Sequence, residues 1–201
     1  VMACFHDAPF VPDGIVNSVN EHGTEVGTVL SSHPEIDVIS FTGSSRTGKI
    51  IMANASDTIK HVSLELGGKA PALVFDDADL DKSVAEIRRG VLALNGQMCT
   101  CISRILVQNS VYDSIRQRLK EAFTSVKIGD ASAAGTELGP IIDRANQQRL
   151  AGIIERAADQ AQMVIHGGVG DGELAKGCFI TPSMFEIDDV GHDLVQDELF
   201  G

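Results

Sequence analysis

An α/β fold with parallel strands and flanking helices is the fold class that this sequence predicts. Short apolar runs rich in β-branched residues alternate with longer stretches in which apolar residues recur at helical spacing. Glycine follows several of the short runs, as is typical of turns between a strand and a helix. Because 43% of the 201 residues are hydrophobic, the chain can bury a sizeable core, and general disorder is excluded.

The strands are expected at the short apolar runs, which are Gly14–Val19, Val38–Phe41, Val62–Leu66, Ala72–Phe75, Arg104–Gln108, Met163–His166 and Cys178–Phe185. The helices are expected at Glu25–Ser32, Ser45–Ala55, Leu80–Leu94, Val111–Val126 and Arg144–Ala161. One stripe of the fourth helix should be buried, and it consists of Ile115, Leu119, Phe123 and Val126. At the third helix, Asp79 is the expected N-cap, and Arg88 and Arg89 are expected on a solvated face.

The expected elements fall into two sets. Gly67, Gly68 and Pro71 interrupt the pattern between residues 65 and 71, and separate strand and helix sets precede and follow this break. We therefore predict two domains, residues 1–66 and 67–201. Two stretches rich in glycine and small residues, 129–140 and 167–177, are expected to be surface loops.

Composition excludes several classes of function. A formal net charge of −12 argues against binding to nucleic acid or to anionic membrane surfaces, and no apolar run is long enough to span a bilayer. The few cysteines (Cys4, Cys99, Cys101 and Cys178) fit a reducing compartment, so we expect a cytoplasmic protein. The histidines show no metal-ligand spacing, and no metal site is predicted.

A glycine-rich turn, residues 43–49, joins an expected strand to an expected helix. Free backbone N–H groups and the positive end of the helix meet at such a turn, and this arrangement suits a phosphate. The spacing from Gly43 to Lys49 matches most of a P-loop, but Ile50 stands where serine or threonine must hold magnesium. Two interpretations stay open: a pyrophosphate turn for a dinucleotide, and a strand–helix turn that binds no ligand.

Two other glycine-marked turns each carry a reactive side chain, LELGG at 64–68 and GQMC at 96–99. A thiolate can attack a carbonyl, and a carboxylate can activate the water that later releases the product. The loop after the helix could expose Cys99 in a cleft, while core packing beside Met98 is the alternative. Glu65 could be partly desolvated between its two leucines, as suits a base, or could face solvent at the end of a strand.

Six short segments occur in the order in which they occur in NAD(P)-dependent aldehyde dehydrogenases, and the chain resembles that family from about residue 12 to Gly201. The segments are FTGS at 41–44, LELGGK at 64–69, GQMC at 96–99, SR at 103–104, GP at 139–140 and DELFG at 197–201. The resemblance implies that residues 1–66 are the C-terminal part of a Rossmann-type domain for NAD or NADP. It implies that residues 67–201 are a truncated α/β catalytic domain.

The resemblance also implies a role for each matching residue. Cys99 matches the nucleophile and Glu65 the general base. The turn that matches the pyrophosphate site consists of Gly43, Ser44, Ser45, Arg46, Thr47 and Gly48. Leu66 and Gly67 match residues that line the nicotinamide site, Glu198 matches the carboxylate on the nicotinamide ribose, and Phe200 lies beside the nicotinamide.

The implied reaction oxidises a small-molecule aldehyde to a carboxylic acid with NAD or NADP. The Cys99 thiolate would form a thiohemiacetal, hydride would leave to the nicotinamide, and Glu65 would activate the water that hydrolyses the thioester. The presence of Glu65 favours hydrolysis over transfer to coenzyme A. Members of the family are usually dimers or tetramers, so the resemblance implies a homo-oligomer.

The resemblance covers a middle section of the family's pattern. The family's PWN-type segment, whose asparagine supplies a second oxyanion donor, lies upstream of this section, as does its lysine on the adenosine ribose. We therefore expect that this chain is a fragment of a longer protein and that it is inactive in isolation. The alternative from another class is a non-catalytic fragment or interaction module that retains the scaffold.

Overall fold

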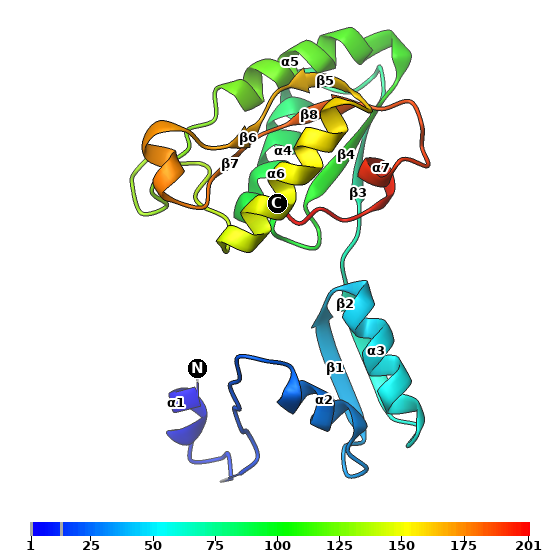
Figure 1. Ribbon diagram of the computed structural model, residues 1–201, viewed down its shortest axis with the longest axis vertical. Coiled ribbons are helices and arrows are strands. Elements are labelled where there is room, and N and C mark those ends of the chain that lie inside the picture. Colours follow the sequence, from blue (N-terminus) through cyan, green and yellow to red (C-terminus); the bar gives the residue numbers. More distant parts are fainter. Residues whose placement is uncertain (1, 13) are drawn as a thin grey trace. The chain divides into compact units, whose positions relative to one another are not determined.

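The computed structural model describes residues 2–12 and 14–201. It divides into two compact units, residues 1–66 (unit 1) and 67–201 (unit 2), which are described separately. Figure 1 labels their helices and strands. Both units combine helices with parallel strand pairs, so the predicted α/β class is confirmed.

Unit 1 is built on a strand–helix–strand motif. Its elements are α1 (Met2–His6), α2 (Glu25–Ser32), β1 (Val38–Gly43), α3 (Ser45–Ser56) and β2 (His61–Leu66). The two strands pair in parallel, with Val38 beside His61 and Gly43 beside Leu66. The strand predicted at 14–19 is wrong, because these residues form a turn and bends instead.

Polar side chains fix both ends of α2. The carboxylate of Glu21 accepts hydrogen bonds from the backbone N–H groups of Val26 and Gly27, at 2.8 and 3.0 Å. Beyond the C-terminal end, the ammonium of the buried Lys60 donates to the carbonyls of His33 and Ile36. The Glu21 contacts satisfy N–H groups that the start of a helix leaves unpaired, and the Lys60 contacts hold the segment that follows the helix.

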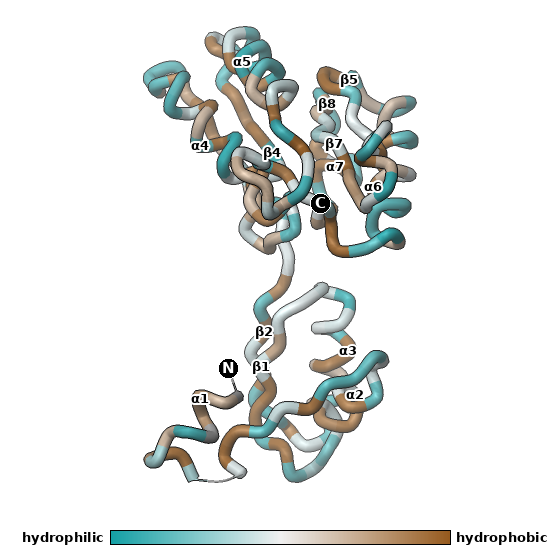
Figure 2. Tube along the Cα trace, turned by 90° about the vertical axis from the view of Figure 1, so that its left-hand side faces the viewer, coloured by the Kyte–Doolittle hydropathy of each residue, from teal (hydrophilic) through white to brown (hydrophobic). Residues whose placement is uncertain are grey.

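Unit 2 contains the remaining elements. Its helices are α4 (Leu80–Leu92), α5 (Tyr112–Thr124), α6 (Arg144–Ala158) and α7 (Asp193–Gln196), with short 3-10 turns η1 (Ala93–Gly96), η2 (Asn109–Val111) and η3 (Gly172–Lys176). Its strands are β3 (Ala70–Val74), β4 (Ile102–Val107), β5 (Gln162–Ile165), β6 (Gly168–Val169), β7 (Ile180–Thr181) and β8 (Met184–Glu186). Figure 2 shows α4, α5 and β4 on one side of the unit and α6, β5, β7 and β8 on the other.

The strand pairs of unit 2 differ in direction. β3 and β4 are parallel, as expected, whereas β5–β8 and β6–β7 are antiparallel. A parallel pair needs a crossover of a dozen or more residues, and the segment between β6 and β7 is shorter than that. The strand predicted at 178–185 is split at Pro182 and Ser183, because proline cannot donate to a strand ladder.

The core of unit 2 lies where α4 and α5 meet β3. Val74 and Ile87 are buried there together with Ile115, Leu119 and Phe123, which confirms three positions of the predicted stripe. The fourth, Val126, is partly buried against them. Asp79 caps α4 as predicted, since its side chain accepts a hydrogen bond from the Lys82 N–H at 3.1 Å.

Candidate active site

The glycine-rich turn of unit 1 is organised by its own residues. Ser44 is the N-cap of α3, and its Oγ accepts a hydrogen bond from the Thr47 N–H at 3.2 Å. Gly48 is buried, and a Cβ there would lie 3.0 Å from the Leu66 side chain, so glycine allows α3 to approach β2 closely. The first turn of α3 presents backbone N–H groups at the C-terminal edge of the strands, as a phosphate site requires.

Glu65 lies at the same edge of unit 1. It pairs in register with Thr42, one residue before Gly43. Leu64 and Leu66 face α3, because both line the position of a Cβ on Gly48, so Glu65 points to the opposite face and is exposed. Of the two interpretations of this carboxylate, the structure shows the one that faces solvent.

The loop from Leu94 to Cys101, which we call the thiol loop, carries Cys99 in unit 2. Leu94, Asn95 and Gly96 have φ angles of 47°, 57° and 75°, three successive residues in the left-handed region. A hydrogen bond of 3.0 Å from the Cys101 N–H to the Met98 carbonyl closes the turn around Cys99. Cys99 is exposed, so the alternative of core packing beside Met98 is wrong, and the role of nucleophile stays a prediction.

The two neighbouring thiols have different surroundings. Cys101 is buried, and its Sγ donates to the Ala93 carbonyl at 3.2 Å. Burial raises the pKa of the Cys101 thiol, and the Met98 backbone hydrogen bond opposes this shift. Cys101 therefore packs as a protonated thiol, and of these two thiols only Cys99 is open to a substrate.

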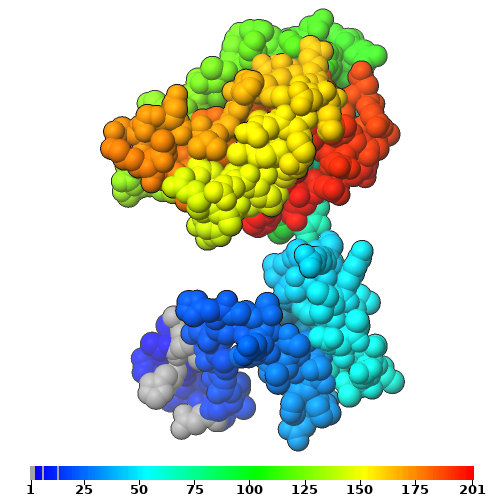
Figure 3. All heavy atoms as spheres, in the orientation of Figure 1, coloured from blue at the N-terminus to red at the C-terminus, as the bar shows by residue number. Residues whose placement is uncertain are grey.

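The DELFG segment at 197–201 lies against the start of unit 2 and against the thiol loop. A Cβ on Gly67 would overlap the carboxylate of Glu198, and a Cβ on Gly96 would lie 2.8 Å from the carbonyl carbon of Gly201. From α6, Arg149 donates to the Leu199 carbonyl and Asn146 to the Phe200 carbonyl. The space-filling view shows the end of the chain, in red, packed along α6, in yellow (Figure 3).

Lys69 is a buried charge that the sequence did not single out. Only 9% of its surface is exposed, and Arg104 donates to its carbonyl at 2.8 Å. Burial lowers the pKa of Lys69 to about 8 and the Arg104 guanidinium acts in the same direction, while Asp197 and Glu198 oppose the shift. A positive charge therefore lies within electrostatic reach of the Glu198 carboxylate.

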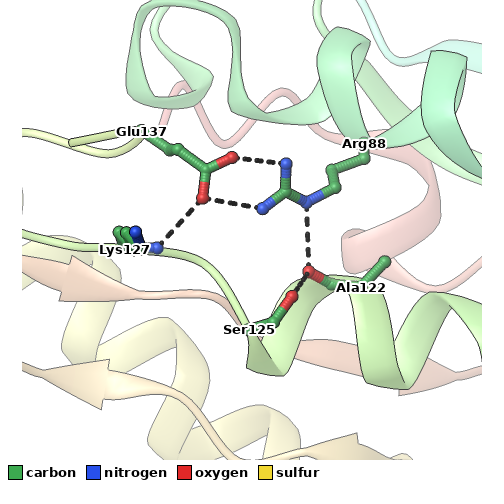
Figure 4. A network of polar contacts seen from close by, with 5 residues as sticks. All are labelled: Arg88, Ala122, Ser125, Lys127 and Glu137. Atoms are coloured by element: carbon green, nitrogen blue, oxygen red, sulfur yellow. Dashed lines mark hydrogen bonds and ion pairs between the residues drawn. The ribbon is translucent and has the colours of Figure 1, made fainter. Parts of the chain in front are cut away.

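Arg88 is not on a solvated face, so that prediction is wrong for this residue. Its guanidinium donates to both carboxylate oxygens of Glu137, at 2.5 and 2.8 Å, and to the Ala122 carbonyl at 3.1 Å (Figure 4). Glu137 also accepts from the Lys127 N–H at 3.2 Å. The prediction is correct for Arg89, whose side chain is 79% exposed.

The expected site residues thus fall into two groups. Unit 1 brings Glu65 and Leu66 to the edge where the 43–48 turn begins α3. Unit 2 brings Gly67, Glu198 and the thiol loop together, and Phe200, 43% exposed, lies in the same segment as Glu198.

Neither a metal site nor a membrane-spanning helix is found in residues 2–12 and 14–201. In these ranges no group of three or more His, Cys, Asp or Glu side chains is placed to hold a metal ion. None of the helices in the same ranges combines the length and the apolar character that crossing a membrane requires.

Comparison with known proteins identifies the family. The model of the aldehyde dehydrogenase family matches residues 1–201, and the chain belongs to this family. A betaine aldehyde dehydrogenase of Vibrio vulnificus is 40% identical over 195 residues. That alignment covers 95% of this chain and 40% of the Vibrio protein, so the chain spans about two fifths of the length of this relative.

Solved structures agree with this assignment. Betaine aldehyde dehydrogenase from Staphylococcus aureus in complex with NAD+ superposes with a TM-score of 0.86 at 38% identity, over 91% of this chain and 37% of that protein. A mutant of aldehyde dehydrogenase C from Pseudomonas syringae, in complex with NAD+ and octanal, gives a TM-score of 0.85 at 31% identity. This second match covers 91% of the present chain and 38% of the Pseudomonas protein.

Proposed function

We propose that this chain, together with any sequence that flanks it in the complete protein, oxidises an aldehyde to a carboxylic acid with NAD or NADP. One observation carries the proposal: unit 2 gathers the thiol loop with its exposed Cys99, Gly67 and the Glu198 carboxylate, which are distant in sequence. Membership of the aldehyde dehydrogenase family supports the same activity. The substrate is a small-molecule aldehyde, and a homo-oligomer in the cytoplasm is proposed on the resemblance.

The residues present fit a nicotinamide dinucleotide. The Ser44-capped start of α3 offers backbone N–H groups to a pyrophosphate, with Gly43 to Gly48 forming the turn. Gly67 has no side chain, so the Glu198 carboxylate can lie over its backbone and accept hydrogen bonds from a ribose. Leu66 and Phe200 would line the nicotinamide. When bound, the nicotinamide ring supplies a hydride acceptor.

Cys99 is proposed as the nucleophile. Its sulfur forms a bond to the carbonyl carbon of the aldehyde while the carbonyl π electrons move to oxygen, giving a thiohemiacetal oxyanion. The Cys99 backbone N–H is the proposed donor to this oxyanion. Loss of hydride from the same carbon leaves a thioester on Cys99. The exposure of the thiol meets the access that this attack needs.

Glu65 is proposed as the general base. Its carboxylate takes a proton from a water, whose oxygen bonds to the thioester carbon. The carbon–sulfur bond then breaks, releasing the carboxylic acid and restoring the Cys99 thiolate. The open position of Glu65 on the face opposite α3 gives it access to water.

Competitive alkylation at neutral pH tests the thiol assignment in this chain, with mass spectrometry resolving its four cysteines. Cys99 should react fastest and lose this advantage in urea. Equal rates for all four, or protection of Cys99, would favour the alternative of a non-catalytic module. The purified 201-residue chain should give no steady formation of NADH, since solved relatives are more than twice as long.

Activity of the complete protein tests the chemistry. Cys99→Ala should lower aldehyde-dependent NADH formation by at least about 10³-fold, because removal of a covalent nucleophile leaves only residual catalysis. Cys178→Ala is the matched control and should retain activity. Full activity in Cys99→Ala would refute the proposed function.

A further inference from the structure

The backbone conformation of the thiol loop is energetically unfavourable. Leu94 and Asn95 both adopt left-handed φ angles, which are unfavourable for residues with a Cβ because the Cβ crowds the following carbonyl oxygen. Asparagine tolerates this region better than most residues, and leucine does not. Other contacts must therefore hold the loop in this conformation.

Two side-chain amides supply those contacts. The Asn95 side chain accepts a hydrogen bond from the Gly139 N–H at 2.9 Å and donates one to the Pro140 carbonyl at 2.9 Å. Gln97 Oε1 accepts from the Ile142 N–H at 2.9 Å. Because Gly139 is buried, its N–H needs a partner, and the Asn95 amide provides it.

The segment that receives these amides is itself fixed. Leu138 and Ile141 are buried, with 7% and 5% of their surfaces exposed. The Ile141 N–H donates to the Cys178 carbonyl at 2.9 Å. Glu137, directly before Leu138, is held by the Arg88 guanidinium, as Figure 4 shows. Residues 137–142 are therefore tied to the rest of unit 2 at Glu137, Leu138 and Ile141 and can support the loop.

We propose that Asn95 and Gln97 are positioning residues that act through this support to fix the direction of the Cys99 thiol. The role given to Cys99 rests on the proposed function, while the contacts of the two amides do not. Asn95 anchors the loop four residues before Cys99 and Gln97 two residues before it. Without these anchors the left-handed residues relax, and the thiol samples many orientations.

Two substitutions separate the anchors from the backbone conformation. Asn95→Gly keeps easy access to the left-handed region but removes both amide hydrogen bonds. Gln97→Met keeps the length of the side chain but removes the acceptor for Ile142. Asn54→Ala is the matched control, because the half-buried Asn54 amide also makes a side-chain hydrogen bond, to Ser31 Oγ at 2.9 Å in unit 1.

The first measurement follows amide exchange and thiol alkylation in the 201-residue chain. Exchange should quicken at Gly139 in Asn95→Gly and at Ile142 in Gln97→Met. In both variants the rate of Cys99 alkylation at neutral pH should shift toward the rate in urea, while Cys178 and the control Asn54→Ala stay as in the wild type. If exchange does not quicken, or if it quickens with an unchanged Cys99 rate, the proposal is overturned.

The second measurement uses the complete protein. Misplacement of the reacting groups slows the chemical step but leaves cofactor binding intact. We therefore expect kcat to fall by about 10²-fold with little change in KM for NAD. An unchanged kcat in both variants would overturn the positioning role. If the wild type itself oxidises no aldehyde, the proposed function fails, and the exchange and alkylation results still decide whether the two amides hold the thiol loop.

Discussion

The turn at Gly43–Gly48 and the thiol loop both carry groups of the candidate site, yet they are stabilised differently. In the turn, Ser44 caps Thr47 three residues away. In the loop, the partners of Asn95 lie 44 and 45 positions further along the chain. The side-chain cap of the turn is local, whereas the side-chain anchors of the loop reach distant segments of unit 2, so the loop should be more sensitive to substitutions that disturb packing.

The sharpest test of this difference in sensitivity replaces one glycine in the thiol loop and one in the turn. Gly96→Ala forces a Cβ onto a residue with φ of 75° and places it 2.8 Å from the Gly201 backbone. Left-handed strain and overpacking together should destabilise unit 2 by roughly 2–4 kcal/mol. In Gly43→Ala the three atoms nearest to the new Cβ all belong to the ring of Phe41, which can rotate, so unit 1 should lose about 1 kcal/mol or less.

Hydrogen exchange can follow both units, and the fluorescence of Tyr112, the one tyrosine of the chain, reports urea unfolding of unit 2. Equal losses in the two variants would show that the two turns are equally dependent on packing, contrary to the comparison.

A second pair of glycines tests the long-range contact of Glu198. In Gly67→Ala the new Cβ overlaps the Glu198 carboxylate, which must move away from the ribose that it is proposed to bind. Affinity of the complete protein for NAD should fall about 10-fold to 100-fold, the value of one charge-assisted hydrogen bond. Gly68→Ala is the control, because a Cβ at Gly68 meets nothing within 4 Å. Equal affinities in both variants would remove Glu198 from the cofactor site.

Elements that depend on local sequence could be predicted. The limits of α2 match those expected from the sequence, and α3 and α6 start at the expected residues. The Asp79 cap was also predictable, because a cap involves a side chain and an N–H only three residues apart. Periodicity likewise indicated the buried stripe of α5, since one helix face determines it.

Features that depend on distant partners could not be predicted. The glycine before the thiol is visible in the sequence, but the hydrogen bonds of Asn95 and Gln97 form only because the fold brings residues 139–142 to the loop. The burial of Lys69 and the bond from Arg88 to Glu137 have the same origin. The resemblance to aldehyde dehydrogenases supplied the roles that are proposed for Cys99 and Glu198, which spacing alone left open.

Each unit contains a buried lysine, and replacing the two lysines should change the stability of their units in opposite directions. Lys60 in unit 1 donates to two carbonyls, so Lys60→Met should destabilise unit 1 by about 1.5–3 kcal/mol. Lys69 in unit 2 has its pKa lowered from 10.5 to about 8, chiefly by burial. Its charged form is therefore unfavourable in the fold, and Lys69→Met should stabilise unit 2 at neutral pH by about 2 kcal/mol.

The sign of the Lys69 effect can be checked with pH. Between about 8 and 10.5 the unfolded chain binds more protons at Lys69 than the folded chain does, so stability rises with pH in this window. Lys69→Met should flatten that rise in urea unfolding curves, and Lys82→Met, an exposed lysine on α4, should not. The same pH dependence in the wild type and in Lys69→Met would contradict the buried charge.

The smallest expected effects come from two carboxylates, Glu21 in unit 1 and Glu137 in unit 2. Hydrogen bonds from the Val26 and Gly27 N–H groups lower the pKa of Glu21, and the Arg88 guanidinium, followed by the Lys127 N–H, lowers that of Glu137. Each contribution is complete above the ordinary carboxyl pKa of 4.5 and is lost as pH falls through the lowered value.

Salt should distinguish these two carboxylates. At about 1 M salt, screening should weaken the Arg88–Glu137 ion pair more than the backbone hydrogen bonds of Glu21. Acid should therefore lower the protection of the Val26 amide, taken relative to its intrinsic exchange rate, at any salt concentration, while protection at Lys127 should respond less to acid in high salt. Glu137→Gln should remove the acid response at Lys127 and leave that at Val26. An unchanged response at Lys127 in this variant would mean that the 127–138 loop is held by its packing instead, and the distant ion pair would then have no part in supporting the thiol loop.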